Sequence, residues 1–209
     1  MARTPARNTP SSPKAGAARN QLRIIAGEWR SRKLAFPDVP GLRPTTDRVR
    51  ETLFNWLSNW VPGSRCLDAF SGSGALGFEA LSRGAEWVTF IDNAQVVTRQ
   101  LQANLTLLNC QQAEVQQAQT QDWLQQPASR QFDLVFLDPP FQRQLLEPAA
   151  QALEQQGWLA DAAMIYIEHE QELQPQLPAS WQLHRQKQAG QVIYSLYHRQ
   201  TGSSDSPTL

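Results

Sequence analysis

Short apolar runs alternate with helical patterns from Arg65 onward, and this alternation limits the fold more than any other feature of the sequence. The runs have the length of buried strands, and the residues between them place apolar side chains at helical spacing. The runs are Arg65–Phe70, Trp87–Ile91, a weak one at Val115, Phe132–Leu137 and Met164–Ile167. Parallel strands need a long crossover, usually a helix, so this order predicts an α/β fold with a mostly parallel sheet and helices on both faces.

Two predicted pairs of antiparallel strands flank this alternating region in the sequence. Near the C-terminus, Trp181–Gln188 and Val192–Tyr197 surround Ala189-Gly190 and predict a closing hairpin at the edge of the sheet. Near the N-terminus, Leu22–Ala26 and Arg32–Phe36 predict a small separate hairpin.

A helix is expected after the N-terminal hairpin. One of Thr45, Thr46 and Asp47 can cap its start, and Pro62-Gly63 stops it. Its apolar stripe consists of Val49, Leu53, Trp56, Leu57 and Trp60.

The length of 209 residues predicts one domain, or one domain with an appendage. Two cysteines are too few for a disulfide framework or a cysteine zinc site, which fits a reducing cytosol. No stretch approaches the ~20 apolar residues of a membrane span, and the N-terminus lacks the apolar core of a secretory signal. The three histidines do not cluster with metal ligands, so no metal is expected. We therefore expect a cytoplasmic protein.

The net charge of zero hides an uneven distribution. Residues 1–50 carry eleven Arg and Lys against three Asp and Glu, a balance of +8, and the rest of the chain carries −8. We expect residues 1–20 to be a disordered basic tail, with or without a polyanionic partner. Residues 21–44 interleave cations with apolar side chains, which indicates a folded basic hairpin. Residues 45–200 are expected to form the main domain and 201–209 a second disordered tail.

A glycine-rich turn follows the first apolar run. Gly72, Gly74 and Gly77 lie where such sheets bind ligands, and they match the dinucleotide fingerprint. Asp92 ends the second run and can hold ribose hydroxyls. The turn alone leaves open a nicotinamide enzyme, another nucleoside binder, or a turn made only for packing. A carboxylate at Asp68 repels a pyrophosphate but suits a cationic sulfonium or ammonium ligand, unless it serves only as a cap or loop acceptor.

A carboxylate, two prolines and an aromatic ring follow the fourth run directly, at Asp138–Phe141. The prolines fix the backbone and offer carbonyls, Asp138 offers a carboxylate acceptor, and Phe141 offers a flat face. Together they predict a rigid slot for a planar group with an amino substituent, whose nitrogen becomes more nucleophilic when its hydrogens are accepted. A plain turn is the alternative. We favour the slot because it faces the same crevice as the glycine turn.

These motifs together resemble those of a known class. Asp68–Gly77, Asp92 and Asp138–Phe141 are similar to the AdoMet-binding and amino-methylating motifs of class I methyltransferases. The strings Arg23–Leu34 and Gly41–Asn55 are similar to signatures of the RsmD family, the bacterial 16S ribosomal RNA guanine-N2 methyltransferases. The likeness runs from about Gln21 to Arg199, and it implies a Rossmann-like sheet, AdoMet as cofactor and methyl transfer to N2 of one guanine.

The resemblance also implies roles for single residues. Asp138 and the Pro139 carbonyl would hold the guanine amino group, and Phe141 would stack on the base. For the adenine amino group, Gln119 stands where such enzymes usually offer Asp or Asn, and Asp122 is a rival. The implied cofactor residues are Asp68, Phe70, Gly72 and Gly74 for the methionine part, Asp92 for the ribose, and Asn93 and Gln119 beside the adenine.

The basic N-terminal part would grip the RNA backbone. Trp29 would stack on a base or else pack within the hairpin, and Arg48 and Arg50 would contact phosphates or else brace the site or pair with nearby acids. The expected RNA-binding residues are Arg23, Trp29, Arg30, Arg32, Lys33, Arg43, Arg48 and Arg50. The implied partner is 16S ribosomal RNA within the small subunit or an assembly intermediate, with the protein as a monomer away from membranes.

Three other functions remain open at this point. The same slot suits a DNA adenine-N6 or a protein glutamine methyltransferase, although the basic hairpin favours RNA. A non-catalytic RNA-binding module is disfavoured by the intact slot. A nicotinamide oxidoreductase is disfavoured by Asp68 and by the antiparallel closing hairpin.

Overall fold

The computed structural model describes residues 20–39, 42 and 44–200. Both predicted tails, except Asn20, lie outside this part of the chain, and so does Arg43. Asn20 is already a strand residue, paired with Phe36. The elements in chain order are β1 (Asn20–Arg23), β2 (Lys33–Phe36), α1 (Asp47–Trp56), β3 (Arg65–Asp68), α2 (Ala75–Ser82), β4 (Trp87–Asp92), α3 (Gln95–Leu107), β5 (Ala113–Gln117), α4 (Thr120–Leu124), β6 (Phe132–Leu137), α5 (Leu146–Gln155), β7 (Leu159–Glu170), β8 (Trp181–Ala189) and β9 (Val192–Arg199).

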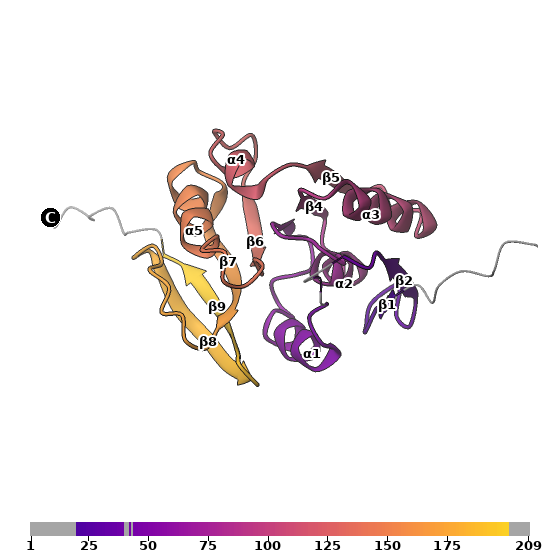
Figure 1. Cartoon of the computed structure of the whole chain (residues 1–209), viewed down its shortest axis with the longest axis horizontal. Helices are drawn as coiled ribbons and strands as arrows, with labels where there is room; N and C mark the ends of the chain where they lie inside the picture. The colour runs from indigo at the N-terminus through magenta and orange to yellow at the C-terminus, as the bar shows by residue number, and fades with distance from the viewer. Residues whose placement is uncertain (1–19, 40–41, 43, 201–209) are drawn as a thin grey trace, which may run out of the picture.

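Seven strands form one sheet in the order β5-β4-β3-β6-β7-β9-β8, which crosses the molecule in Figure 1. Strands β5, β4, β3, β6 and β7 run parallel to one another, and β9 runs antiparallel between β7 and β8. The predicted Rossmann-like sheet with an antiparallel C-terminal hairpin is therefore confirmed. The chain leaves β3 toward β4 and β5 and then returns to place β6 on the other side of β3, so the order reverses between β3 and β6.

Helices cover both faces of this sheet, as expected. Helices α1, α2 and α3 bury their apolar side chains in one core cluster, and α4 and α5 contribute to a second. Successive strand residues alternate between the two clusters, as Cys66 and Leu67 do in β3. Figure 1 shows α4 and α5 on one side of the sheet and α1 and α2 on the other.

The N-terminal hairpin is shorter on its first strand than the predicted Leu22–Ala26. Strand β1 ends at Arg23, and Ile24 still donates across the hairpin to the Arg32 carbonyl at 2.9 Å, but the two following amides find other acceptors. The N–H groups of Ile25 and Ala26 donate to the Glu79 carboxylate on α2, at 2.8 and 3.0 Å. The chain therefore leaves the strand to bond a helix.

Three further boundaries differ from those expected. Helix α1 is capped by the Thr46 side chain, which accepts from the N–H of Val49, and it ends at Trp56, so that Trp60 lies beyond it and is exposed. The short helix α4 was not predicted. Strand β7 is longer than Met164–Ile167 at both ends, because Leu159 pairs with Phe132 of β6 and because β9 pairs with it as far as Glu170.

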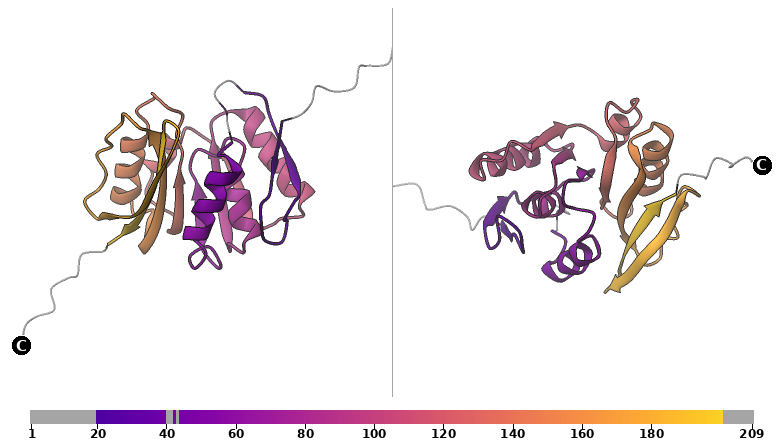
Figure 2. Two further views of the ribbon diagram at one scale, coloured as in Figure 1. Left: turned by 90° about the horizontal axis from the view of Figure 1, so that it is seen from below. Right: turned by 180° about the vertical axis from the view of Figure 1, so that it is seen from behind.

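The β1–β2 and β8–β9 hairpins lie at opposite ends of the molecule in both views of Figure 2. The carboxyl ends of the parallel strands lie between them. Among the described residues, no helix is both long and apolar enough to cross a membrane.

Candidate active site

A cavity of about 780 Å³ opens where the strand order reverses. In open α/β sheets, ligands bind in this crevice at the carboxyl ends of the strands. The cavity brings together nearly all of the predicted cofactor and catalytic residues. Those that line it are Asp68, Phe70, Gly72, Asp92, Asn93, Gln119, Asp138, Pro139 and Phe141. Gly74 lies just behind its wall.

The glycine turn has the backbone that its sequence predicts. Gly72 and Gly74 have φ of +49° and +75°, a region that other residues seldom adopt. The N–H of Gly72 donates to Oδ2 of Asp92 at 3.0 Å, so the turn is fastened to the end of β4. A Cβ on Gly77 would lie 2.3 Å from Cε1 of Phe90, which confirms that this glycine allows α2 to pack closely on the sheet.

Asp68 is buried at the end of β3 beneath this turn. Its Oδ2 accepts the N–H of Gly77 at 3.0 Å. Burial and the nearby charge of Asp92 raise the pKa of Asp68 to about 7, although the Gly77 hydrogen bond opposes the shift. A positively charged ligand in the cavity would favour the ionised form.

Asp92, Asn93 and Gln119 form the wall beyond the turn. Asp92 accepts the N–H of Ala94 at 2.8 Å on one oxygen and the N–H of Gly72 on the other. Burial raises the pKa of Asp92, and these backbone N–H groups counteract it. Asn93 donates from Nδ2 to Oε1 of Gln119 at 3.2 Å, and Gln119 lines the cavity, whereas its rival Asp122 does not.

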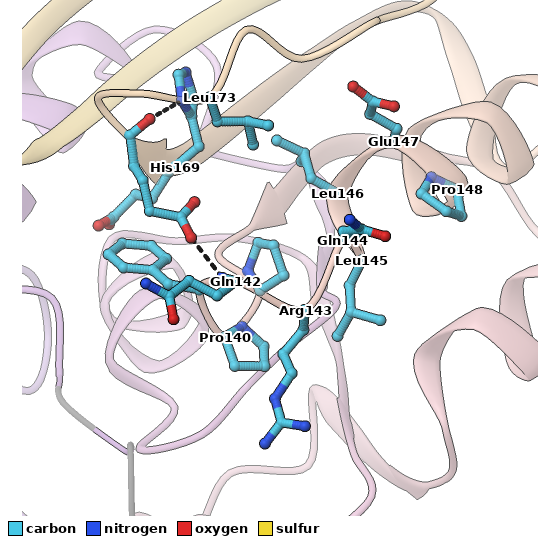
Figure 3. Close-up of a pocket in the computed structure, with 14 residues that line it drawn as sticks. Pro140, Gln142, Arg143, Gln144, Leu145, Leu146, Glu147, Pro148, His169 and Leu173 are labelled. Atoms are coloured by element: carbon cyan, nitrogen blue, oxygen red, sulfur yellow. Dashed lines mark hydrogen bonds between the residues drawn. The ribbon is translucent and has the colours of Figure 1, made fainter.

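The Asp138–Phe141 segment turns sharply after β6 and forms the opposite wall. Pro139 is buried, and Phe141 is 41% exposed, so its ring is accessible. The N–H of Gln142 donates to Glu170, which ties the segment to the end of β7. Figure 3 shows the chain after Pro140 curving round an adjoining cavity of about 450 Å³, with Arg143 extending away from His169.

Sequence reasoning missed two polar residues beside Asp138. Thr45 precedes α1, and its Oγ1 lies 3.4 Å from Oδ2 of Asp138 and donates to Oε1 of Glu168 at 3.1 Å. Glu168 stands in β7 next to the end of β6, where it also accepts the hydroxyl of Tyr166 at 2.7 Å. The position of Glu168 directly after the apolar run Met164–Ile167 was an available signal. No local pattern marks Thr45, which reaches both carboxyl groups from far away in the sequence.

The two neighbouring carboxyl groups influence each other. Desolvation, the charge of Glu168 and the charge of Asp68 raise the pKa of Asp138 well above its ordinary value. Burial also raises the pKa of Glu168, while the hydroxyls of Tyr166 and Thr45 oppose that shift. The pair therefore favours ligands that bring hydrogen-bond donors to it.

The predicted RNA-binding residues that the structure describes, all except Arg43, do not line the cavity. Arg23 pairs with Asp47 at 3.2 Å, and Trp29 is half-buried against the core. Arg30, Arg32, Lys33 and Arg48 are exposed.

Arg50 requires a correction. Its side chain is only 1% exposed, because it bonds Asp47 at 2.7 Å and lies 3.7 Å from Glu79. It is a buried structural cation and is not available to a phosphate. The pairing with Asp47, which the sequence left open, is the one found.

A glycine turn and the Asp138-Pro139-Pro140-Phe141 segment meet at the switch point of a Rossmann-like sheet, with carboxylates at the ends of β3, β4 and β6. This combination defines a class I methyltransferase. The family model described as Conserved hypothetical protein 95 matches residues 22–198, and the chain belongs to this family, the RsmD family. The nicotinamide oxidoreductase is thereby set aside.

Similar proteins span almost the whole chain. Ribosomal RNA small subunit methyltransferase D of Escherichia coli (strain K12) is 53% identical over 188 residues, 89% of this chain and 94% of that protein. The protein of the same name from Haemophilus influenzae is 49% identical over 183 residues, 86% of this chain and 95% of that protein. The solved structure described as "Putative methyltransferase yhhF from Escherichia coli" has a TM-score of 0.81 and 52% identity, and it covers 87% of this chain and 99% of that chain.

Proposed function

We propose that the protein transfers a methyl group from AdoMet to the exocyclic N2 amine of a guanine in 16S ribosomal RNA of the small ribosomal subunit. One observation carries the proposal: the amine slot at Asp138–Phe141 and the glycine turn open onto the same cavity. The names of the similar proteins from E. coli and H. influenzae support ribosomal RNA as the substrate.

The residues of the cavity fit AdoMet. About 780 Å³ is within the range of small-molecule sites. Asp92 would accept the hydroxyls of the ribose, and Asp68 offers a buried carboxylate whose pKa is raised by burial and by the charge of Asp92. Because Gly72 has no side chain, a ligand can approach its backbone closely. When bound, AdoMet supplies an electrophilic methyl group on a sulfonium centre.

The slot prepares the amine for attack. Asp138 and the Pro139 carbonyl accept hydrogens of the guanine amino group, which directs its nitrogen lone pair toward the glycine turn. The exposed ring of Phe141 stacks on the base. A base held within a helix must first be turned out to reach this slot. Catalysis then comes from positioning and from the exclusion of water.

Cations outside the cavity would hold the RNA. Arg30, Arg32, Lys33 and Arg48 are exposed, and three of them belong to the β1–β2 hairpin or its turn. We propose that this hairpin and the segment before α1 contact phosphates, with Trp29 able to stack on a base only if it leaves its packed position. We also propose that the protein acts as a cytoplasmic monomer on the small subunit or an assembly intermediate of it.

Replacement of Asp138 tests the slot. We expect Asp138→Ala to reduce methyl transfer by at least about 100-fold, the scale of losing one preorganised polar contact to a reacting group. AdoMet binding, measured by calorimetry, should remain largely unchanged, because Asp138 faces the base. Asp161→Ala, on an exposed carboxylate of β7, is the matched control. Wild-type turnover by Asp138→Ala would contradict the proposed role of the slot.

A further inference from the structure

Glu168 is a buried carboxylate to which the proposed transfer assigns no task. It is 7% exposed and lies one residue beyond the paired positions Leu137 and Ile167, beside Asp138. It also lines the main cavity and the adjoining one. Burial of a carboxylate costs free energy unless hydrogen bonds or an opposite charge compensate for it. The position of Glu168 beside the amine slot therefore suggests that a ligand supplies such a contact.

One oxygen of Glu168 is occupied, and the other is open. Oε1 accepts the hydroxyls of Tyr166 and Thr45. Oε2 has no hydrogen-bond partner among the described residues, and Glu168 lines the cavity. Within that part of the chain, the carboxylate is therefore held through one oxygen only.

Thr45 couples this carboxylate to Asp138. Its hydroxyl lies 3.1 Å from Oε1 of Glu168 and 3.4 Å from Oδ2 of Asp138, so two acceptors stand side by side. Within the described part of the chain, no ion pair neutralises either carboxylate. Such a pair suits a ligand edge that carries adjacent N–H donors.

Guanine has such an edge. Its N1–H lies next to its N2 amino group, so both positions donate, whereas the ring nitrogen N1 of adenine is an acceptor. Turned-out bases are commonly read by hydrogen bonds to this edge. A carboxylate beside the amine slot therefore favours guanine over a purine that has an acceptor at N1.

We infer that Glu168 reads the target base by accepting the guanine N1–H on Oε2, while Asp138 holds the N2 amine and Thr45 positions both carboxylates. This inference rests on the proposed guanine-N2 transfer. It makes Glu168 a determinant of base specificity.

The test compares two bases at one position. The methylated guanine is first located by nucleoside mass analysis of small subunits treated with the wild-type protein. Subunits are then reconstituted with RNA that carries guanine or 2-aminopurine at that position. 2-Aminopurine keeps the N2 amine but has an acceptor in place of N1–H. We expect the wild-type protein to methylate 2-aminopurine about 10- to 100-fold more slowly, the effect of one charge-assisted hydrogen bond.

Glu168→Gln should abolish this preference, because the glutamine amide can donate to the N1 acceptor of 2-aminopurine. A simple loss of structure would slow both bases and leave their ratio unchanged. Glu172→Gln, on an exposed carboxylate, is the matched control and should keep the wild-type ratio. Thr45→Val should lose part of the preference, since Glu168 keeps its Tyr166 contact.

The outcomes separate the two proposals. Equal wild-type rates on both bases, or an unchanged ratio in Glu168→Gln, would overturn the role of Glu168 while leaving guanine-N2 transfer intact. If Glu168→Gln does not fold, equal wild-type rates on the two bases would still overturn the role of Glu168. Absence of N2-methylguanosine in the guanine arm would overturn the proposed function and the role of Glu168 together.

Discussion

Four carboxylates stand at the ends of four neighbouring strands, and within the described residues none is paired with a lysine or arginine. Backbone N–H groups hold Asp68 and Asp92, and hydroxyls hold Asp138 and Glu168. Burial raises the pKa of all four carboxyl groups, and the charges of neighbouring acids add to the shift for Asp68 and Asp138. The site is therefore prepared for a cationic ligand on one side and for N–H donors on the other.

The sequence predicts three of these four acids, since Asp68 lies near the end of an apolar run and Asp92 and Asp138 each follow one directly. Glu168 follows a run as well, but no motif surrounds it. Thr45 was named only as a candidate helix cap, and its role in the site could not be predicted, because its contacts span 93 and 123 residues of chain and exist only after the sheet is assembled.

The raised pKa of Asp68 predicts pH-dependent cofactor binding. Asp68 titrates at about 7 in the folded protein, so its ionised fraction grows as the pH rises through 7. A sulfonium ligand favours the ionised form, and its dissociation constant should therefore fall between pH 5.5 and pH 8, by at most about tenfold per pH unit. Calorimetry at several pH values measures this dependence.

Asp68→Asn is the control for that titration. It should bind AdoMet weakly with a flatter pH profile, since asparagine carries no charge but can still accept the Gly77 N–H. The stability of the ligand-free protein should fall as the pH rises, whereas its affinity for AdoMet increases. Because the pKa of Asp68 is higher in the folded protein than in the unfolded chain, the stability contributed by Asp68 declines as the pH rises from about 4 to about 7. A wild-type binding profile in Asp68→Asn would refute the assignment.

At the scale of elements, Glu79 holds the N-terminal hairpin on the main domain. Its carboxylate accepts two backbone N–H groups from the hairpin, bonds Arg83 at 2.7 Å and lies 3.7 Å from the buried Arg50. This one side chain joins α1, α2 and the end of β1. It also explains why β1 stops earlier than its apolar pattern predicts.

Removal of Glu79 should be severe. Glu79→Ala leaves Arg50 buried beside an empty position, and a broken buried ion pair costs about 3–5 kcal/mol of stability. Urea unfolding followed by circular dichroism measures this loss. Glu86→Ala, on an exposed acid nearby, should change stability by less than about 0.5 kcal/mol. Equal effects of the two substitutions would mean that Glu79 does not anchor the hairpin.

Elements with a strong apolar pattern in the sequence were predicted well. Elements whose bounds depend on contacts with distant parts of the chain were not. Strands β4 and β6 and the closing hairpin lie close to their predicted bounds. Helix α4 is only five residues long, too short for a periodic signal. The extension of β7 depends on β9, which follows it only after a long connection.

At the scale of the whole molecule, the two hairpins lie at opposite ends (Figure 2), and cations of the first hairpin are exposed. Because the net charge of the chain is zero, a polyanion would be attracted to a local cluster of positive side chains such as this one. The uneven charge was visible in the sequence. The burial of Arg50 was not, because it depends on the contact between α1 and α2.

Salt dependence tests this basic end. In a plot of log affinity against log salt concentration, each phosphate contact contributes nearly one to the slope. A double variant that combines Arg30→Ala and Lys33→Ala should therefore reduce the slope for 16S ribosomal RNA by about 1.5–2. Filter binding at several salt concentrations measures it. Lys187→Ala, on the opposite hairpin, should leave the slope nearly unchanged. An equal reduction from Lys187→Ala would show that RNA does not prefer the N-terminal end.

The most direct measurement is methyl transfer from labelled AdoMet to small ribosomal subunits that lack the modification, followed by nucleoside mass analysis. The arrangement of slot and glycine turn predicts N2-methylguanosine as the labelled product, absent with Asp138→Ala. Incorporation into N6-methyladenosine, or no incorporation into ribosomal RNA, would contradict the proposed function.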